Sequence, residues 1–451
     1  MPTKFIEHFE RGLLLMSGRE TFSGKIGFIL ACVGAAMGLG SIWMFPWRLG
    51  TYGGAAFLVP YLLFTFVLGV TGLMGEFGFG RSQQRGAMGA FENVLREKGK
   101  GYGASLGIIP VLGVTGVFIF YIIVCGWILK YFVLAVTNAF GSLDLPAYFG
   151  AFAGQPESIV WHLLAMIVTL SIVIKGVQGG IEKSNKIMMP ALFIILFILM
   201  IRSLTLPGAG KGIKFLLVPD WSHLADPMTW VIALGMAFFT VCLGGAAMVV
   251  YGSYLKKDED IPSSAINTAF WTTIASLISA FVTIPAAFAF NMDPQAGPPL
   301  LFITVPQIFQ AMPGGYLFGV LFFLCVTFAA ISSAINLMEV PVEAVMDRFK
   351  LSRNKSVIIV ALLGFLVGLP LDINMNLFGM FADFVTVYLV PFGAVIAAFV
   401  FFWIYGVDRA RQEINRGAAR PLGKWWEFHA KYVFVLTSVA VLILGIVVGG
   451  F

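Results

Sequence analysis

An apolar stretch near the start of the sequence contains residues that weaken a helix and supply oxygen atoms. This stretch, VGAAMGLGSIWMFP, covers residues 33–46 and holds three glycines followed by Ser41 and Pro46. A glycine costs about 1 kcal/mol in a helix interior, and a broken helix in hydrocarbon frees amides and carbonyls that need partners. Freed carbonyls can coordinate Na+, and freed amides can bind a carboxylate. The alternative is close helix packing, because Gly34 and Gly38 form a GxxxG pair.

Further oxygen atoms lie in three other apolar stretches. Ser332 and Ser333 are adjacent in FAAISSAINLMEV, and their hydroxyls suit Na+, although such serines often bond back to their own helix. Tyr121 offers a hydroxyl, or alternatively a core ring, and Thr240 precedes a second glycine pair at Gly244. Almost no charge accompanies these groups, so a carboxylate substrate would need a cation bound beside it. Such co-binding couples two fluxes, and the membrane potential contributes roughly 2.3 kcal/mol per charge per 100 mV.

The elements that position these residues are expected to be membrane-spanning helices. The chain has 451 residues, 59% of them hydrophobic and 12% charged, with a mean hydropathy of +0.91, whereas soluble domains are about 25% charged. A β-barrel would need short alternating segments, but these runs are long and continuous. We predict an all-α polytopic membrane protein with eleven transmembrane helices, at residues 25–49, 54–80, 106–138, 158–176, 182–201, 228–253, 264–290, 316–346, 356–371, 376–405 and 432–450.

The basic residues predict the orientation of these helices. Most of the 29 Lys and Arg residues fall at one side if the N-terminus is inside, so the positive-inside rule places the N-terminus in the cytoplasm and the C-terminus outside. The net charge of +6 then reflects topology and the lipid bilayer as partner, with no nucleic acid. No obligatory protein partner is inferred, and the four cysteines are expected to pack as small hydrophobes.

Paired glycine breaks predict an inverted repeat. The first and sixth spans each break near the middle, and each begins a group of five spans, so the second group is inverted in the membrane. The predicted organisation is a cytoplasmic segment at 1–24, a first repeat at 25–203, a second repeat at 227–405 and a last helix at 432–450. Residues 291–315 are expected to form an external hairpin whose short helix dips into the protein, or alternatively a surface loop.

Several motifs resemble the neurotransmitter:sodium symporter family, and most closely its bacterial members that carry hydrophobic amino acids. They are GKIGFILACVGAAMGLGSIWMFPW, GGAAFLVPYLLF, GEFGFGR, FFTVCLGGAAMVVYGSYLKKDEDI and FAAISSAINLMEVPVEAVMD. The resemblance covers nearly the whole chain. It implies the fold of the bacterial leucine transporter, with broken helices one and six, alternating access, and Na+-coupled import in the direction of the cytoplasm.

The resemblance also implies site residues. The first of two sodium ions maps to Ala36, Ser41, Thr240 and Thr272, with Asn267 as an alternative to Thr272, and the second to Gly34, Met37, Ala329, Ser332 and Ser333. The substrate carboxylate maps to the amides of Leu39 and Gly40 and to Tyr121, and its ammonium group to carbonyls of Ala36, Phe239 and Thr240. The side-chain pocket maps to Val117, Tyr121, Phe239, Cys242, Gly245, Ser333 and Leu337.

Two departures from the family pattern concern the substrate. Monoamine carriers have an Asp where this chain has Gly38, so the substrate is expected to bring its own carboxylate. Gly245 stands where the leucine-selective relative has Phe, which predicts room for Trp, Phe and Tyr as well as Leu. Chloride use is not predicted, because Tyr61 and Ser276 match the ligands of chloride-dependent members but Met236 does not.

The resemblance implies gates on both sides of the site. Tyr121 and Phe239 match the external lid, and Arg19, Asp347 and Tyr254 match the cytoplasmic gate. Asp383 matches the external acidic residue, but its usual Arg partner is replaced by Met44, and Arg48 is the candidate substitute. A fourth feature, Gly180 followed by Pro190, matches a pattern at which the family unwinds helix five, or alternatively marks a proline kink.

Other functional classes make different demands on the sequence. An intramembrane hydrolase would need paired catalytic residues, and no histidine lies mid-span with a partner; no Walker A motif is present either, so an enzyme is not expected. A channel can also contain broken helices, and a sensor would bind an amino acid without net flux. Both remain alternatives that transport measurements distinguish.

Overall fold

The structure is a computed structural model that describes residues 20–292 and 300–450, and within these ranges it contains helices and no strands. Nine of its helices are long and apolar enough to cross a membrane, and a tenth crossing is the bent pair formed by α2 (Lys25–Ala36) and the segment Gly40–Thr51. The two halves α12 (Pro227–Thr240) and α13 (Ala247–Ser253) supply one further broken crossing. The all-α prediction is confirmed, and the elements are consistent with eleven spans.

The crossings follow the chain in order. Most are longer than predicted by a few residues, since their helices extend beyond the apolar core. The nine continuous crossings are Ala55–Gln83 (α4, η2 and α5), Gly103–Val136 (α7), Pro156–Val173 (α9), Val177–Leu204 (η4 and α10), Ile261–Ala289 (α14), Gly315–Phe349 (α16), Arg353–Asp372 (α17), Met375–Asn415 (α18, η7, α19, η8 and α20) and Trp425–Val448 (α21, η9 and α22).

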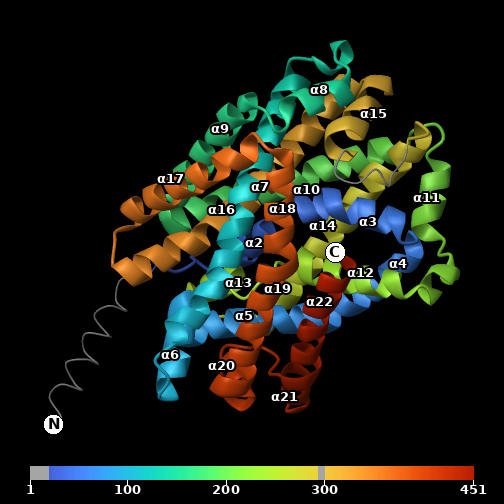
Figure 1. Cartoon of the computed structure of the whole chain (residues 1–451). Helices are drawn as coiled ribbons and strands as arrows, with labels where there is room; N and C mark the ends of the chain where they lie inside the picture. The colour runs from blue at the N-terminus through green and yellow to red at the C-terminus, as the bar shows by residue number, and fades with distance from the viewer. Residues whose placement is uncertain (1–19, 293–299, 451) are drawn as a thin grey trace, which may run out of the picture.

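Short helices lie at the two ends of the bundle. In Figure 1, α6 (Ala87–Glu97), α20 (Val407–Asn415) and α21 (Trp425–Phe428) lie at the end where the chain begins. The opposite end carries α8 (Leu145–Phe152) and α15 (Val305–Ala311). The remaining short elements are η1 (Gly40–Met44), α3 (Phe45–Thr51), η3 (Phe140–Ser142), α11 (Gly210–Leu217), η5 (Trp221–Ala225) and η6 (Leu300–Thr304).

Two boundaries differ most from the sequence prediction. The last span begins at Trp425 instead of residue 432, because a π-helical turn, His429–Phe434, joins the amphipathic start to the apolar part. Span ten continues to Asn415 through a second π-turn, Val400–Gly406, so polar residues that were expected in a loop are helical. The predicted short helix of the external hairpin is present as α15, with Val305, Ile308 and Phe309 buried; residues 293–299 lie outside the described part.

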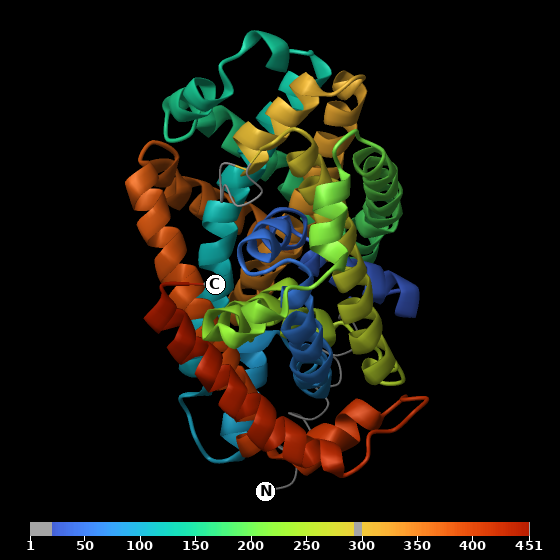
Figure 2. The same ribbon diagram turned by 90° about the vertical axis from the view of Figure 1, so that its right-hand side faces the viewer.

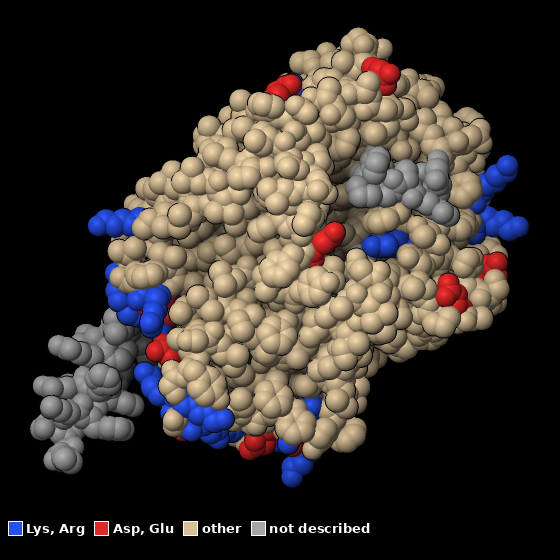
Figure 3. Space-filling view, viewed as in Figure 1, with Lys and Arg blue, Asp and Glu red and all other residues tan. Residues whose placement is uncertain are grey.

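The broken crossing of span one lies inside the bundle. Figure 2 shows its blue second part in the middle of the molecule, between helices from both halves of the chain, whereas the dark-blue start of α2 reaches the right-hand edge. It packs against α10, α14 and α16, and the helix axes on its two sides differ by 58°. On the face shown in Figure 3, Lys and Arg gather mostly at the end near the N-terminus, and most of the middle is uncharged. This distribution agrees with the predicted orientation.

A buried ion pair joins the last helix of span ten, α20, to span two. Arg81, at the end of α5, is fully buried and donates from Nε to Glu413 of α20 over 2.8 Å. Its Nη1 donates to the Glu259 carbonyl over 2.6 Å, and its Nη2 donates to the Glu413 carbonyl. One guanidinium therefore joins α5, α20 and the loop before α14.

Replacing Arg81 is expected to destabilise the protein, because it leaves the Glu413 carboxylate without its buried partner. Arg81→Ala should lower the free energy of unfolding by about 3–5 kcal/mol, measured as a lower melting temperature of the purified protein in detergent. Arg416→Gln is the control, since Arg416 contacts the same carboxylate over 3.3 Å from the surface and such pairs contribute about 0–1 kcal/mol. Equal melting temperatures for the two variants would contradict the role of Arg81.

Candidate functional site

The serines of α16 meet the broken first span. Ser332 Oγ donates to the Gly34 carbonyl over 2.9 Å, and Ser333 Oγ donates to the Ala35 carbonyl over 3.1 Å. Ser332 also contacts the Ala329 carbonyl over 3.0 Å. Both side chains are buried. The back-bonding alternative therefore holds in part for Ser332, but both hydroxyls reach across to α2, where the second sodium ion was predicted.

Helix α2 of span one ends close to the backbone carbonyls that the predicted second sodium site requires. In the last backbone hydrogen bond of α2, the Met37 amide donates to the Val33 carbonyl over 2.7 Å. The next turn begins with the amides of Ser41 and Ile42, which both donate to the Gly38 carbonyl. The break is thus narrower than the glycine-containing stretch 33–46 and centres on residues 37–39. Of the predicted second sodium site, the Gly34 and Ala329 carbonyls both contact the Ser332 hydroxyl, whereas the Ser333 hydroxyl contacts the neighbouring Ala35 carbonyl.

Tyr121 of α7 closes the break from the other side. Its hydroxyl accepts a hydrogen bond from the Leu39 amide over 3.1 Å, so two of the predicted carboxylate ligands are adjacent. Gly38 fits only because it has no side chain: a Cβ there would lie 2.7 Å from Tyr121 Oη and 2.8 Å from Ser333 Oγ. An Asp at this position, as in monoamine carriers, would displace both hydroxyls.

The predicted first sodium ligands are all buried. Ser41 Oγ lies 3.4 Å from the Ala36 carbonyl, and Thr240 Oγ1 donates to the Met236 carbonyl over 2.8 Å and contacts the Tyr61 hydroxyl over 3.1 Å. Thr272 Oγ1 donates to its own helix at Thr268 over 2.8 Å. Thr272 is fully buried, whereas Asn267 is only half-buried and lies nearer the start of α14. Burial thus favours Thr272 over its alternative.

A residue that the sequence analysis did not identify supports the second break. Glu76 of α5 is buried, and its Oε1 accepts hydrogen bonds from the amides of Gly244 and Gly245 over 3.1 and 2.9 Å. These amides lie between α12 and α13, where no helical carbonyl reaches them. The available signal was an acidic residue within the apolar run LMGEFGFG, because carboxylates inside membranes are rare and usually functional.

Gly245 does not fit the expectation made for it. Its φ is +77°, and a Cβ there would lie 2.3 Å from the Gly393 carbonyl oxygen and 2.9 Å from Ala397 Cβ. A side chain at this position would therefore point at α19 rather than into the pocket. In this conformation the glycine serves the turn and the close approach of α19, and the argument that it enlarges the pocket is wrong.

The remaining pocket residues differ in exposure. Leu337 is buried, Val117 and Cys242 are half-buried, and Phe239 is 45% exposed. The Phe239 ring lies over the first break, since a Cβ at Gly40 would be 2.3 Å from its Cε1. Solvent therefore reaches the predicted external lid. On this side Asp383 is exposed, and no ion pair joins it to Arg48 in the part of the chain that the structure describes.

On the predicted cytoplasmic side, aromatic side chains and an ion pair close the structure. Phe22 packs against Tyr251 and Tyr254, and all three are buried. Tyr254 Oη donates to Glu339 over 2.6 Å, and Glu339 in turn binds Arg353 of α17 over 2.5 Å. The structure thus combines a solvent-accessible Phe239 ring with a closed cluster of rings and charges at the predicted cytoplasmic gate. Around Gly180 the chain is helical as the π-turn η4 (Val177–Glu182), continuous with α10.

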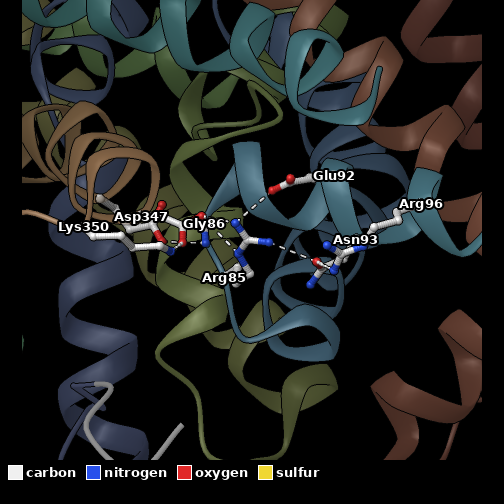
Figure 4. Close-up of polar contacts among 8 residues, drawn as sticks. Arg85, Gly86, Glu92, Asn93, Arg96, Asp347 and Lys350 are labelled. Carbon is white, nitrogen blue, oxygen red and sulfur yellow. Dashed lines mark hydrogen bonds and ion pairs between the residues drawn. The ribbon is translucent and has the colours of Figure 1, made fainter. Parts of the chain in front are cut away.

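Asp347, the predicted gate acid, binds a residue that the sequence analysis did not name. Arg85, in the turn between α5 and α6, donates to Asp347 Oδ2 from Nη2 over 2.6 Å and from Nε over 3.0 Å. Figure 4 shows this cluster, in which Lys350 and Glu92 also take part. A Cβ at Gly89 would lie 2.6 Å from Asp347 Oδ2, so the glycine makes room for the pair. Arg19 lies outside the described residues.

The fold and site define a class of transporter with two broken helices, and comparisons place the chain within it. A model of the sodium:neurotransmitter symporter family matches residues 19–143 and 152–449. An uncharacterized sodium-dependent transporter of Bacillus subtilis is 39% identical over 390 residues, which cover 83% of this chain and 86% of the relative. Another, of Methanocaldococcus jannaschii, is 31% identical over 454 residues, covering 94% and 90%.

A solved structure agrees with these relatives. The crystal structure of MhsT in complex with L-phenylalanine matches with a TM-score of 0.85 and 35% identity, covering 95% of this chain and 100% of that chain. The chain therefore belongs to the sodium:neurotransmitter symporter family, and the family resemblance predicted from its motifs is confirmed.

Removing the Glu76 carboxylate is expected to impair transport strongly, because the Gly244 and Gly245 amides lose their hydrogen-bond acceptor and the break in span six loses its shape. Glu76→Ala should lower the rate of sodium-driven uptake at least tenfold, about what is lost when one buried charged hydrogen bond worth ~1.5 kcal/mol or more is removed. Glu76→Gln, which keeps the Oε1 acceptor, should retain more activity. The control is Glu157→Gln, which changes an exposed pair with Lys130. Full activity in Glu76→Ala would contradict this role.

Weakening the Arg85–Asp347 pair is expected to open the cytoplasmic end. Since both side chains are partly exposed, Arg85→Gln should shift the conformational equilibrium by about 1 kcal/mol, or about fivefold. The measurement is the rate at which a thiol reagent labels the buried Cys32 of α2, with the other cysteines replaced by alanine. Lys350→Gln, which alters the exposed contact to the same carboxylate, should leave the rate unchanged. If both variants label like the parent, Arg85 has no part in the closure.

Proposed function

We propose that the protein is a sodium-coupled symporter that imports large hydrophobic L-amino acids, such as Trp, Phe, Tyr and Leu, by alternating access. The observation that carries this proposal is the convergence of groups at the first break. The Tyr121 hydroxyl and Leu39 amide lie 3.1 Å apart, and the hydroxyls of Ser332 and Ser333 reach the carbonyls of the same short segment. One broken helix thus offers donors for a carboxylate next to oxygen ligands for Na+.

The charge of the site supports coupling rather than simple binding. Ser41, Thr240, Tyr121 and Ser333 are uncharged, and the one acid beside the breaks, Glu76, is held by backbone amides. A substrate carboxylate at the Leu39 and Gly40 amides would therefore gain from a sodium ion bound near Ala36, and the ion would gain from the carboxylate. Two sodium ions, at the first and second predicted sites, fit this arrangement.

The proposed substrate class rests on the glycine at position 38, on the apolar pocket walls and on a related structure. Gly38 leaves no acid to hold an amine without a carboxylate, and a Cβ there would collide with Tyr121 and Ser333. The side-chain pocket has apolar walls in Val117, Phe239 and Leu337. The related structure of MhsT is a complex with L-phenylalanine, which favours a large hydrophobic side chain here as well.

The proposed membrane arrangement follows from the distribution of charge. Lys and Arg lie mainly at the end with α6, α20 and α21, which would face the cytoplasm of a cell whose plasma membrane holds the protein. The N-terminus would then be cytoplasmic and the C-terminus outside. Conversion to the inward-facing state would require the Glu339 and Asp347 contacts to separate while Phe239 closes over Tyr121.

A sensor that binds amino acid without flux is the second candidate, because the same groups would bind a ligand in either case. Flux decides between them. In liposomes, labelled Trp and Leu should accumulate above equilibrium with an inward Na+ gradient and not when K+ replaces Na+. Sodium-dependent binding without accumulation would identify a sensor. Uptake that ignores Na+ and stops at equilibrium would contradict the proposal and indicate a channel.

Ser332→Ala is expected to raise the sodium concentration for half-maximal uptake, because it removes a proposed ligand of the second ion. The expected change is about tenfold. Thr327→Ala is a matched control on the same helix, since Thr327 Oγ1 bonds only its own helix at Phe323 over 2.7 Å. Uptake should be measured against sodium concentration at saturating Leu. Identical sodium curves for the two variants would exclude Ser332 from the ion site.

A further inference from the structure

A buried oxygen atom of span five lies beside the predicted second sodium site. Asn185 of α10 is fully buried, and its Nδ2 donates to the Ile181 carbonyl of the same helix over 2.9 Å. This bond fixes the orientation of the amide, so that Oδ1 faces away from α10. Oδ1 has no hydrogen-bond partner within residues 20–292 and 300–450. Buried polar atoms normally have a partner, and an exception calls for an unrecorded ligand or a functional reason.

The Asn185 oxygen points at the backbone of Gly34. A Cβ built on Gly34 would lie 2.0 Å from Asn185 Oδ1 and 3.3 Å from Ser332 Cβ. Three helices, α2, α10 and α16, therefore meet at this glycine, and only a residue without a side chain fits between them. The carbonyl of the same glycine accepts from Ser332 Oγ over 2.9 Å.

We propose that Asn185 is a positioning residue of the second sodium site and sets its sodium affinity. The inference rests on the proposed function, which places Na+ at the Gly34 carbonyl and the Ser332 and Ser333 hydroxyls. The partial negative charge of Oδ1 lies behind Gly34 in surroundings of low dielectric constant, where a nearby cation is its natural electrostatic partner. The ion thus compensates the oxygen that lacks a hydrogen bond.

The contact also links the ion to span five. Because Asn185 of α10 is anchored to the preceding π-turn η4 at Ile181, a bound ion holds α2 against α10 as well as against α16. Loss of the ion leaves the oxygen uncompensated, which weakens the contact between α2 and α10.

The experiment measures binding of labelled phenylalanine to the purified protein as a function of sodium concentration. Asn185→Ala should raise the half-maximal sodium concentration about tenfold, as expected for loss of a group that supports a metal ligand, with unchanged phenylalanine affinity at saturating Na+. A purely structural role would instead lower the amount of folded protein or both affinities. The matched control is Thr169→Ala, which removes another fully buried side chain that bonds to its own helix, at Ala165 over 2.9 Å.

A second pair of variants tests the contact itself. Gly34→Ala should impair sodium binding because its methyl group meets Oδ1, and adding Asn185→Ala should restore part of the loss by vacating that space. If wild-type binding is independent of Na+, the proposed function fails. If wild-type binding depends on Na+ but Asn185→Ala and Thr169→Ala give the same sodium curve as wild type, the function stands and the role of Asn185 is overturned.

Discussion

The structure depends on one constraint: a backbone group inside hydrocarbon must have a partner, or it costs several kcal/mol. Two crossings are broken, and the freed groups are met by side chains from other spans. The Leu39 amide meets Tyr121, the Gly34 and Ala35 carbonyls meet Ser332 and Ser333, and the Gly244 and Gly245 amides meet Glu76. Each partner is polar but, apart from Glu76, uncharged. The first break is therefore stabilised without a charged side chain that would compete with an ion or a substrate.

This arrangement explains why so many glycines surround the site. A helix can approach a side chain of another helix closely only where its own side chain is absent, and Gly34, Gly38 and Gly40 each face one: Asn185, Tyr121 and the Phe239 ring. The first two contacts bring oxygen atoms to the broken segment, and the third brings the lid. The GxxxG packing alternative and the binding hypothesis are thus not exclusive, because the same close approach that packs the helices also delivers the ligands.

The fold and the location of the breaks could be predicted from the sequence, but several partners could not. Glycine, proline and hydrophobic run length are local signals, and they gave the broken first and sixth spans and the class of the protein. Arg85 and Asp347 are separated by 262 residues, and Glu76 and Gly245 by 169, so no local pattern joins them. The prediction made for Gly245 was wrong for a related reason. Its alignment with the Phe of a relative does not reveal the backbone angle, which would direct a side chain at this position toward α19.

The two ends of the molecule differ in the strength of their closure, and the difference has a physical origin. The cytoplasmic end is joined by ion pairs with buried or partly buried members, Glu339–Arg353 and Arg85–Asp347, whereas the external end relies on the apolar Phe239 and an exposed Asp383. Separating charged side chains requires other interactions that compensate for the lost attraction. Moving an apolar lid that has no ion pair costs little free energy. Under the proposed function, ions and substrate bound together at the breaks would supply the free energy that separates these ion pairs. Coupling would then depend on the unequal closure of the two ends as well as on shared ligands.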